Sequence, residues 1–234
     1  MTTNSVRENL LRMQERIAGA AARAGRNADE ITLIGVSKTH PANAIREAFE
    51  AGVRHFGENR VQEWEGKRTG TEGLAATWHL IGHLQNNKAV RAARLFHSID
   101  SVDDLALAQR LDRARVEVGI PEKLRVLIEV RVAPEETKSG VETREASELA
   151  EKIASLPRLE LGGLMCIPPF LEQAEKVRSY FRRLRELRDD LAKTLGLALP
   201  VLSMGMSHDF EVAIEEGATE VRVGTALFGT RIAG

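Results

Sequence analysis

The sequence predicts an α/β protein built as a single TIM-type (β/α)8 barrel with an extra helix at its N-terminus. About eight apolar runs alternate with segments of helical period from Ile31 onward, and eight parallel strands close such a barrel. Several runs, such as ITLIGV and LRVLIEV, lack polar alternation, as expected of strands that are buried on both faces. The chain of 234 residues is long enough for one barrel and contains no linker-like stretch between these units.

We expect one domain over residues 1–234, with the N-terminal helix in residues 1–30 and the barrel in residues 31–234. An open, doubly wound sheet is the alternative architecture, because it uses the same alternation of strands and helices. In the N-terminal segment, Ser5 and Glu8 have the spacing of a capping box. Val6, Leu10 and Ile17 fall on one side of the helix that follows, which predicts that this side packs against the barrel.

The expected strands follow one another along the chain. They are Ile31–Ser37, His55–Glu58, Trp78–Gly82, Phe96–Ile99, Leu124–Val130, Leu159–Ile167, Pro200–Met204 and Glu220–Val223. Pro41 marks the first position of a helix that Gly52 ends, and Ser101 is a possible cap of another helix. The longest helix is expected from about Leu171 to Leu195, where apolar residues recur at three- and four-residue spacing.

The composition argues against several classes of partner. The formal net charge is −1, so neither nucleic acid nor an anionic membrane surface is an expected partner. The single cysteine, Cys166, excludes a disulfide within one chain and a cysteine-based zinc site, and its apolar neighbours predict a buried side chain. The N-terminus has no apolar region typical of a signal peptide, and no apolar run is long enough to cross a bilayer. We therefore expect a cytoplasmic protein, and a monomer.

Functional side chains of a parallel barrel gather at the carboxyl ends of its strands. The first expected strand runs directly into Lys38. Burial at the barrel mouth would lower the pKa of the Lys38 amine and make it nucleophilic, whereas the alternative is a solvated lysine in an ordinary loop. The second expected strand ends at Glu58 and Asn59. The Asn59 amide can hydrogen-bond a ligand, or it can cap the helix that follows.

The last two expected strands end in segments with small residues that suit a phosphate group. Glycines expose backbone N–H groups there, and hydroxyl side chains add further donors. The candidate residues for the phosphate are Ser203, Gly224 and Thr225, and Met204 and Ser207 are further candidates for cofactor binding. For Ser207 the alternative is an N-cap of a helix that begins near His208.

Arg222 lies two residues before Gly224, so the two side-chain positions point to the same face of the strand. If that face is the barrel interior, Arg222 needs an acceptor, which a ligand ring nitrogen or an internal carboxylate would supply equally well. A lysine opposite an anion site, with an arginine between them, is the arrangement that a phosphorylated aldehyde cofactor requires.

At these residues the sequence resembles the pyridoxal phosphate homeostasis protein family, whose barrel is similar to the N-terminal domain of alanine racemases. The matching segments are spread over nearly the whole chain. They are VSKTH at 36–40, FGENRVQE at 56–63, WHLIGHLQNNK at 78–88, GLMCIPP at 163–169 and LSMGMSHDFEVAI with VRVGTALFG between 202 and 229.

The resemblance implies that pyridoxal 5′-phosphate (PLP) forms a Schiff base with Lys38. It implies that Ser203, Gly224 and Thr225 surround the phosphate, as the small residues of those loops also suggest. It places Arg222 beside the pyridine nitrogen and Asn59 beside the ring. Met165 is expected near a ring face, with a plain core methionine as the alternative.

The resemblance further implies a protein of PLP homeostasis, which buffers the cofactor and supplies it to apo-enzymes without turnover. An arginine is a poor proton donor to the pyridine nitrogen, and the only tyrosine, Tyr180, lies on the long helix. The alternative is a PLP-dependent amino-acid racemase with His79, His83 or His208 as its base. A third hypothesis is a phosphosugar enzyme that uses Lys38 as an aldolase-type base. Lys138 is a candidate for a second anion site or a solvated loop lysine.

Overall fold

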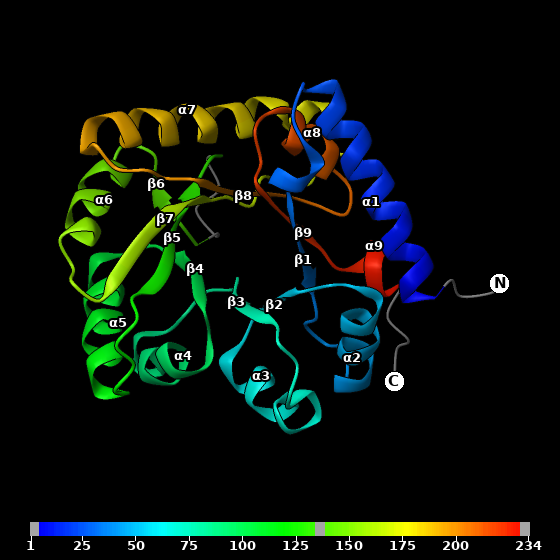
Figure 1. Cartoon of the computed structure of the whole chain (residues 1–234). Coiled ribbons are helices and arrows are strands. Elements are labelled where there is room, and N and C mark those ends of the chain that lie inside the picture. The colour runs from blue at the N-terminus through cyan, green and yellow to red at the C-terminus, as the bar shows by residue number, and fades with distance from the viewer. Residues whose placement is uncertain (1–4, 134–138, 230–234) are drawn as a thin grey trace.

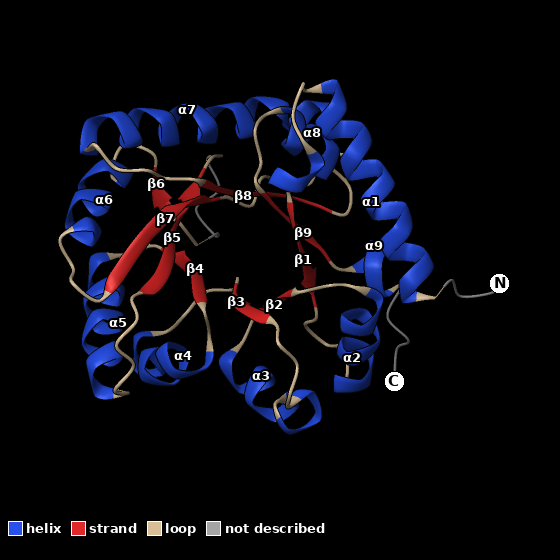
Figure 2. Ribbon diagram, viewed as in Figure 1, coloured by secondary structure: helices blue, strands red, loops and turns tan. Residues whose placement is uncertain are grey.

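A closed ring of parallel strands surrounded by helices forms the centre of the molecule, in a computed structural model that describes residues 5–133 and 139–229 (Figures 1 and 2). The ring strands are β1 (Thr32–Val36), β2 (His55–Glu58), β3 (Thr77–Leu80), β4 (Ser98–Val102), β5 (Leu124–Arg131), β7 (Leu159–Met165), β8 (Val201–Met206) and β9 (Glu220–Val223). They are hydrogen-bonded in the order β4-β3-β2-β1-β9-β8-β7-β5, and β4 also pairs with β5. The pairing of β4 with β5 closes the ring, so the predicted barrel is confirmed and the doubly wound alternative is wrong.

Only β2 and β9 have the predicted bounds; the other six ring strands begin or end at different residues, and one further strand of the described residues was not predicted. The short strand β6 (Val141–Glu142) pairs with the end of β5 and was not predicted, because two residues carry no periodic pattern. The fourth ring strand begins at Ser98, whereas we expected it to begin at Phe96. The Phe96 N–H donates to Ala92 O at the end of a helix, and its buried ring packs in the main core. Its apolar character therefore reflects helix packing and not strand pairing.

The helices of the described residues are α1 (Val6–Arg23), α2 (Ala42–Ala51), α3 (Val61–Lys67), α4 (Ala89–Leu95), α5 (Leu105–Glu117), α6 (Ala146–Ala154), α7 (Arg178–Leu195), α8 (Phe210–Glu215) and α9 (Thr225–Phe228). Single 3₁₀ turns span Ala28–Glu30, Thr69–Thr71, Asn86–Lys88 and Ala174–Val177. The 3₁₀ turn at Ala174–Val177 occupies part of the segment predicted as the start of the longest helix. No helix in the described part of the chain is long and apolar enough to cross a membrane.

The helix ends confirm two predictions, including the stop of α2 at Gly52, and correct two others. Ser5 and Glu8 form the expected capping box of α1. Pro41 is the N-cap of α2 and not its first helical residue. Asp104, not Ser101, caps α5, because its carboxylate accepts the Leu107 N–H at 2.7 Å.

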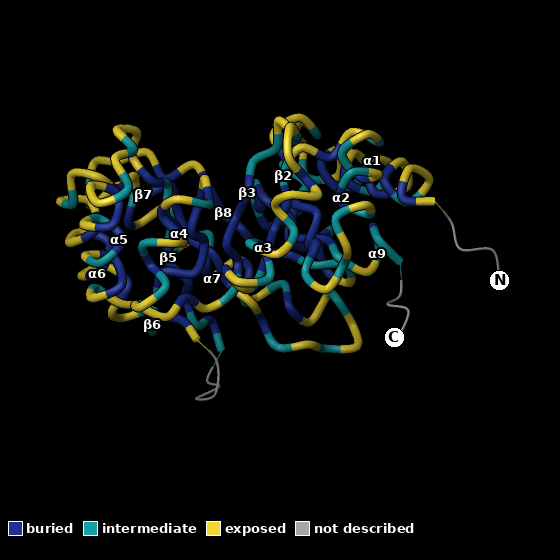
Figure 3. Tube along the Cα trace, turned by 90° about the horizontal axis from the view of Figure 1, so that it is seen from below, coloured by how far each residue is buried: buried dark blue, intermediate teal, exposed yellow. Residues whose placement is uncertain are grey.

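Helix α1 packs across the outside of the barrel against α2, α8 and α9 (Figure 1). Its buried side chains join the large apolar core between the strands and the helices. Figure 3 shows this distribution, with buried segments along the strands and exposed ones along the outer sides of the helices. A second and much smaller apolar cluster consists of Leu127, Met165 and Val201. These three residues lie on the adjacent strands β5, β7 and β8, apart from the main core.

Candidate functional site

Lys38 follows the carboxyl end of β1 and lies half-buried between the ends of its two neighbouring strands. Ser37 before it is fully buried, and Thr39 after it has φ = 65°, a left-handed backbone that residues other than glycine rarely adopt. His40 stacks on Phe228 of α9, with 4.6 Å between the ring centroids. The loop that carries Lys38 is therefore joined to the segment after β9.

The loops after β8 and β9 also meet. Ser207 Oγ accepts the Ala226 N–H at 3.4 Å, and Gly205, the second-last residue of β8, has φ = 92°. A side chain at Gly205 would place its Cβ 2.9 Å from the Phe210 Cα, so this position requires glycine. At the start of α9, Gly224 O accepts the N–H groups of residues 227 and 228. Neither of the two preceding N–H groups has an acceptor within the helix; that of Ala226 donates to Ser207 Oγ, and that of Thr225 is a donor of the kind that an anion needs.

Arg222 points into the barrel interior. Two residues earlier on β9, Glu220 is hydrogen-bonded to Arg125 of β5 at 2.9 Å across the ring, which identifies the inward face of β9. Arg222 is only 3 % exposed and donates to Ser203 Oγ at 2.9 Å and to Cys166 O at 2.8 Å. The predicted residues Ser203 and Arg222 are thus brought together inside the barrel.

Glu129 near the end of β5 is a buried acid that the sequence analysis did not assign. Its Oε1 accepts the hydroxyl of Ser139 at 3.0 Å, while its Oε2 has no hydrogen-bond partner in the described part of the chain. Burial raises the pKa of Glu129, nearby Asp103 adds to the rise, and the charge of Arg222 opposes it. A charged residue inside the apolar run LRVLIEV was the signal in the sequence.

The predicted residues Met165 and Met204 lie on opposite sides of the barrel wall. Met165 is buried in the small cluster with Leu127 and Val201. Met204 is buried in the main core on the helix side, because it follows the inward-facing Ser203 on the same strand. The Met204 side chain therefore points away from the interior, and only its backbone faces the candidate site.

Neither predicted capping alternative is correct. The N-cap of α3 is Arg60 and not Asn59, which lies half-buried directly after the end of β2. The N-cap of α8 is Asp209 and not Ser207, and α8 begins at Phe210. The candidate second anion site at Lys138 lies outside the described residues.

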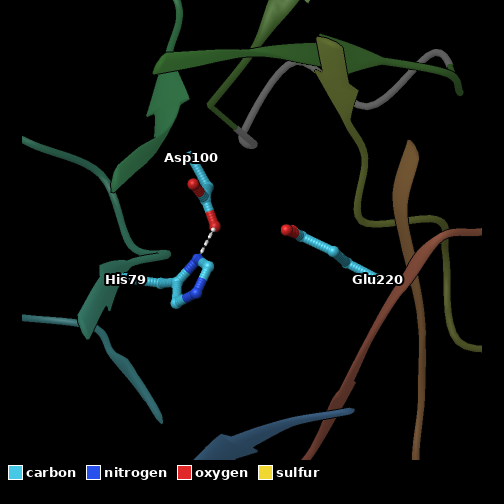
Figure 4. A group of neighbouring side chains, drawn as sticks. All are labelled: His79, Asp100 and Glu220. Carbon is cyan, nitrogen blue, oxygen red and sulfur yellow. Dashed lines mark hydrogen bonds and ion pairs between the residues drawn. The ribbon is translucent and has the colours of Figure 1, made fainter. Parts of the chain in front are cut away.

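A network of charged residues fills the amino-terminal half of the barrel interior, where Figure 4 shows His79, Asp100 and Glu220 pointing toward one another. Their ligand atoms lie within 4.8 Å of one another, a grouping that could hold a metal ion. However, Arg125 Nη2 lies 2.9 Å from Glu220 Oε1 and 3.2 Å from His79 Nδ1. This guanidinium already supplies the positive charge, so we infer no metal site here.

The charge balance of this network moves two carboxyl pKa values in opposite directions. Burial tends to raise the pKa of Asp100, but His79 and Arg125 outweigh it and the pKa is lowered. Burial and the nearby Asp100 charge raise the pKa of Glu220. His55 extends the network, with 3.0 Å between His55 Nδ1 and His79 Nε2. These groups hold one another in place below the candidate site.

Sequence reasoning also missed three residues that contact the loop of Lys38. Glu58 and Lys67 both bond to Ser37, and Glu63 accepts the Thr39 N–H. Glu58 was noted only as a polar group at the end of a strand. The four-residue spacing of Glu63 and Lys67 on one helix was the available signal for the other two.

Comparison with known protein families gives a match over nearly the full chain. The model of the alanine racemase N-terminal domain matches residues 3–232. A pyridoxal phosphate homeostasis protein from Aquifex aeolicus is 50% identical over 224 residues, which cover 96% of this chain and 97% of that protein. The protein of the same name from Escherichia coli K12 is 44% identical over 233 residues, 97% of each chain.

Solved structures show the same barrel. PipY from Synechococcus elongatus, solved with PLP bound, is 41% identical, with a TM-score of 0.81 over 91% of this chain and 100% of its own. An alanine racemase from Clostridium difficile is 17% identical, with a TM-score of 0.73 over 98% of this chain and 57% of its own. At that identity the racemase shows the fold alone.

Proposed function

This chain belongs to the family of pyridoxal phosphate homeostasis proteins, and we propose that it binds PLP and acts in PLP homeostasis without turnover. The observation that carries the proposal is the half-buried Lys38, which lies at the same end of the barrel as the buried Arg222 and the loops after β8 and β9. A primary amine, a buried cation and backbone donors for an anion are what a phosphorylated aldehyde on an aromatic ring needs.

The residues at this end of the barrel fit PLP in polarity. The Ser207 hydroxyl and the Thr225 N–H at the start of α9 suit a phosphate. The unpartnered Glu129 Oε2 shows that the interior contains a polar atom that the described residues do not satisfy. Met165 is an apolar side chain of the small interior cluster, on the strand next to the inward-facing Ser203.

We assign the individual roles as follows. The Lys38 amine would hold PLP covalently through its aldehyde carbon. Ser203, Ser207, Gly224 and Thr225, together with the Met204 backbone, surround the phosphate. Arg222 faces the pyridine nitrogen, and Asn59 and Met165 lie beside the ring. When bound, PLP supplies a reversible imine, and the arginine keeps the ring nitrogen unprotonated, which weakens carbanion chemistry.

Reductive trapping tests the proposal. Borohydride treatment of the protein with PLP, followed by peptide mass mapping, is expected to label Lys38. The Lys38→Ala variant is expected to lose both the label and the imine absorbance, while Lys193→Ala, at an exposed position on α7, keeps both. Labelling of a different lysine, or of none, would refute the assignment.

The racemase alternative finds little support among the three candidate bases. His79 is fully buried in the lower network, and His208 Nε2 contacts the carbonyl oxygens of Leu171 and Glu172. His83 lies exposed beside Asp103, at 3.4 Å. Incubation with L-alanine in deuterated water is expected to give no exchange at Cα. Appreciable exchange would favour a racemase.

The partners and the cellular location belong to the same proposal. A PLP-holding protein that lacks turnover acts by releasing the cofactor to apo-enzymes, and we propose such enzymes as transient partners. We further propose that the protein acts as a monomer in the cytoplasm, where PLP enzymes need the cofactor. Transfer of PLP from the loaded protein to an apo-transaminase, followed by recovery of transaminase activity, is the corresponding assay.

A further inference from the structure

Three charged side chains of β2 and α3 contact the turn that carries Lys38. They are Glu58, Glu63 and Lys67, and we call them the lysine clamp. Lys67 Nζ donates to Glu58 Oε1 at 3.0 Å and to Glu63 Oε1 at 2.7 Å. The exposed fraction of the side chain is 0% for Glu58, 12% for Lys67 and 25% for Glu63. This ion pair network is therefore shielded from solvent in its central part, where such interactions are strongest.

The clamp contacts the backbone on both sides of Lys38. Before it, the buried Ser37 donates its hydroxyl to Glu58 Oε1 at 2.7 Å, and Ser37 O accepts from Lys67 Nζ at 2.8 Å. After it, the Thr39 N–H donates to Glu63 Oε1. The Lys67 ammonium group therefore contacts Ser37 directly and is linked to Thr39 through the Glu63 carboxylate.

These contacts explain why Thr39 can adopt its unusual backbone. A left-handed conformation at a β-branched residue costs free energy and persists only where surrounding contacts hold it. Here the Thr39 N–H is fixed by Glu63, and the His40 N–H closes the turn on Ser37 O at 3.0 Å. Without the clamp the turn would relax toward a commoner conformation, and the direction of the Lys38 side chain would change with it.

We propose that Lys67, with Glu58 and Glu63, is a positioning group that fixes the Thr39 turn and thereby aims the Lys38 amine into the barrel mouth. This inference rests on the proposed function, since it names what orients the PLP-binding lysine. Lys67 itself is committed to three oxygen-bearing partners, so it serves Lys38 through the backbone and does not compete with it for the aldehyde.

The test compares Lys67→Met with a matched pair elsewhere in the chain. Glu148 and Lys152 form an ion pair with the same four-residue spacing on α6, where both side chains are exposed, so Lys152→Met is the control. In the protein without ligand, Lys67→Met is expected to speed amide hydrogen exchange at Thr39 by at least roughly tenfold, the effect of losing about one charged hydrogen bond. Its rate of imine formation with PLP is expected to fall by a similar factor. Lys152→Met is expected to change neither quantity.

Two substitutions of Glu63 distinguish an effect on the position of Lys38 from an effect on overall stability. Glu63→Gln keeps a carbonyl oxygen that can accept from Thr39, and is expected to retain most of the imine rate. Glu63→Ala removes the acceptor, and is expected to behave like Lys67→Met. Equal imine rates in these two variants would contradict the role given to Glu63.

Two results would overturn the inference as a whole: unchanged exchange at Thr39 in Lys67→Met, or faster exchange with an unchanged imine rate. Failure of the proposed function gives a different result. A wild-type protein that forms no imine on Lys38 refutes PLP binding there, while the exchange measurement still decides whether the clamp holds the turn.

Discussion

The reactivity of Cys166 is determined by its place in the barrel. Its side chain is fully buried at the end of β7, and its carbonyl oxygen accepts a hydrogen bond from Arg222. Burial raises the pKa of its thiol to about 12, and Arg222 only partly opposes this effect. Because the thiolate is the reactive form, the residue contributes backbone and volume to the site and no nucleophile.

We therefore predict that Cys166 is inert in the folded protein. An aromatic disulfide reagent at pH 8 is expected to give almost no colour with native protein, with or without PLP. After unfolding in guanidinium it is expected to titrate one thiol per chain, because the sequence contains one cysteine. Rapid reaction of the native protein would contradict both the burial and the raised pKa.

Strands and helices could be predicted where burial against the core produces a clear pattern of apolar residues. The bounds of β2 and β9 agree with the prediction residue for residue, and Lys38 and Arg222 lie near strand ends as parallel-barrel rules require. The orientation of Met204 was not predictable without the inward-facing Ser203 as a reference, since neighbouring residues on a strand point to opposite faces. The pairing of β8 with β9 also shifts register between Ser203 and Met206.

Polar contacts between segments that are distant in the chain could not be predicted from the sequence. The lysine clamp joins β1, β2 and α3, and no local pattern tells that Lys67 reaches Ser37. The charged residues of the barrel interior were not predicted for a related reason. Ser98 and Asp100 are polar residues on a strand that we expected to be apolar and to end at Ile99. They bond to each other, and their other partners come from other strands. Side chains from opposite strands of the barrel become hydrogen-bond partners only when the barrel closes. Closure depends on the whole chain, so no local sequence pattern predicts these pairs.

At the scale of elements, α1 offers a matched pair of leucines. Leu10 is 3% exposed and packs in the main core, whereas its neighbour Leu11 is 54% exposed. Leu10→Ala is expected to lower the free energy of unfolding by about 2–5 kcal/mol, because it leaves a cavity between α1 and the barrel. Leu11→Ala is expected to change it by less than about 0.5 kcal/mol. Urea denaturation of both variants checks this, and equal effects would show that α1 does not pack as described.

For the whole molecule, the charged interior makes stability depend on pH. Burial lowers the pKa of His55 to about 4, and the nearby His79 and Arg125 add to this shift. In the unfolded chain the pKa is near 6.5, so the unfolded state binds the extra proton first as the pH falls. Stability from this group is complete above about pH 6.5 and is lost as the pH falls to about 4. His97, whose pKa burial also lowers, acts in the same direction.

We predict that His55 makes the thermal stability of wild-type protein fall with pH between 6.5 and 4, so that the change in stability over this interval is less destabilising in His55→Gln. His83→Gln serves as the control, because the His83 side chain is 54% exposed and lies outside the interior network. Scanning calorimetry at several pH values measures the slopes. Parallel curves for wild type and His55→Gln would show that His55 is not the group responsible.

The pairing of β1 with β9 sets the order in which the molecule can be completed. These strands lie near opposite ends of the sequence, and each forms part of the wall of the candidate site. A growing chain on the ribosome therefore exposes Lys38 long before Arg222 and Gly224 have been made. The proposed site is therefore complete only after translation has passed β9, and we expect nascent chains to be poor scavengers of a vitamin B6 aldehyde. We expect only finished molecules to hold the cofactor.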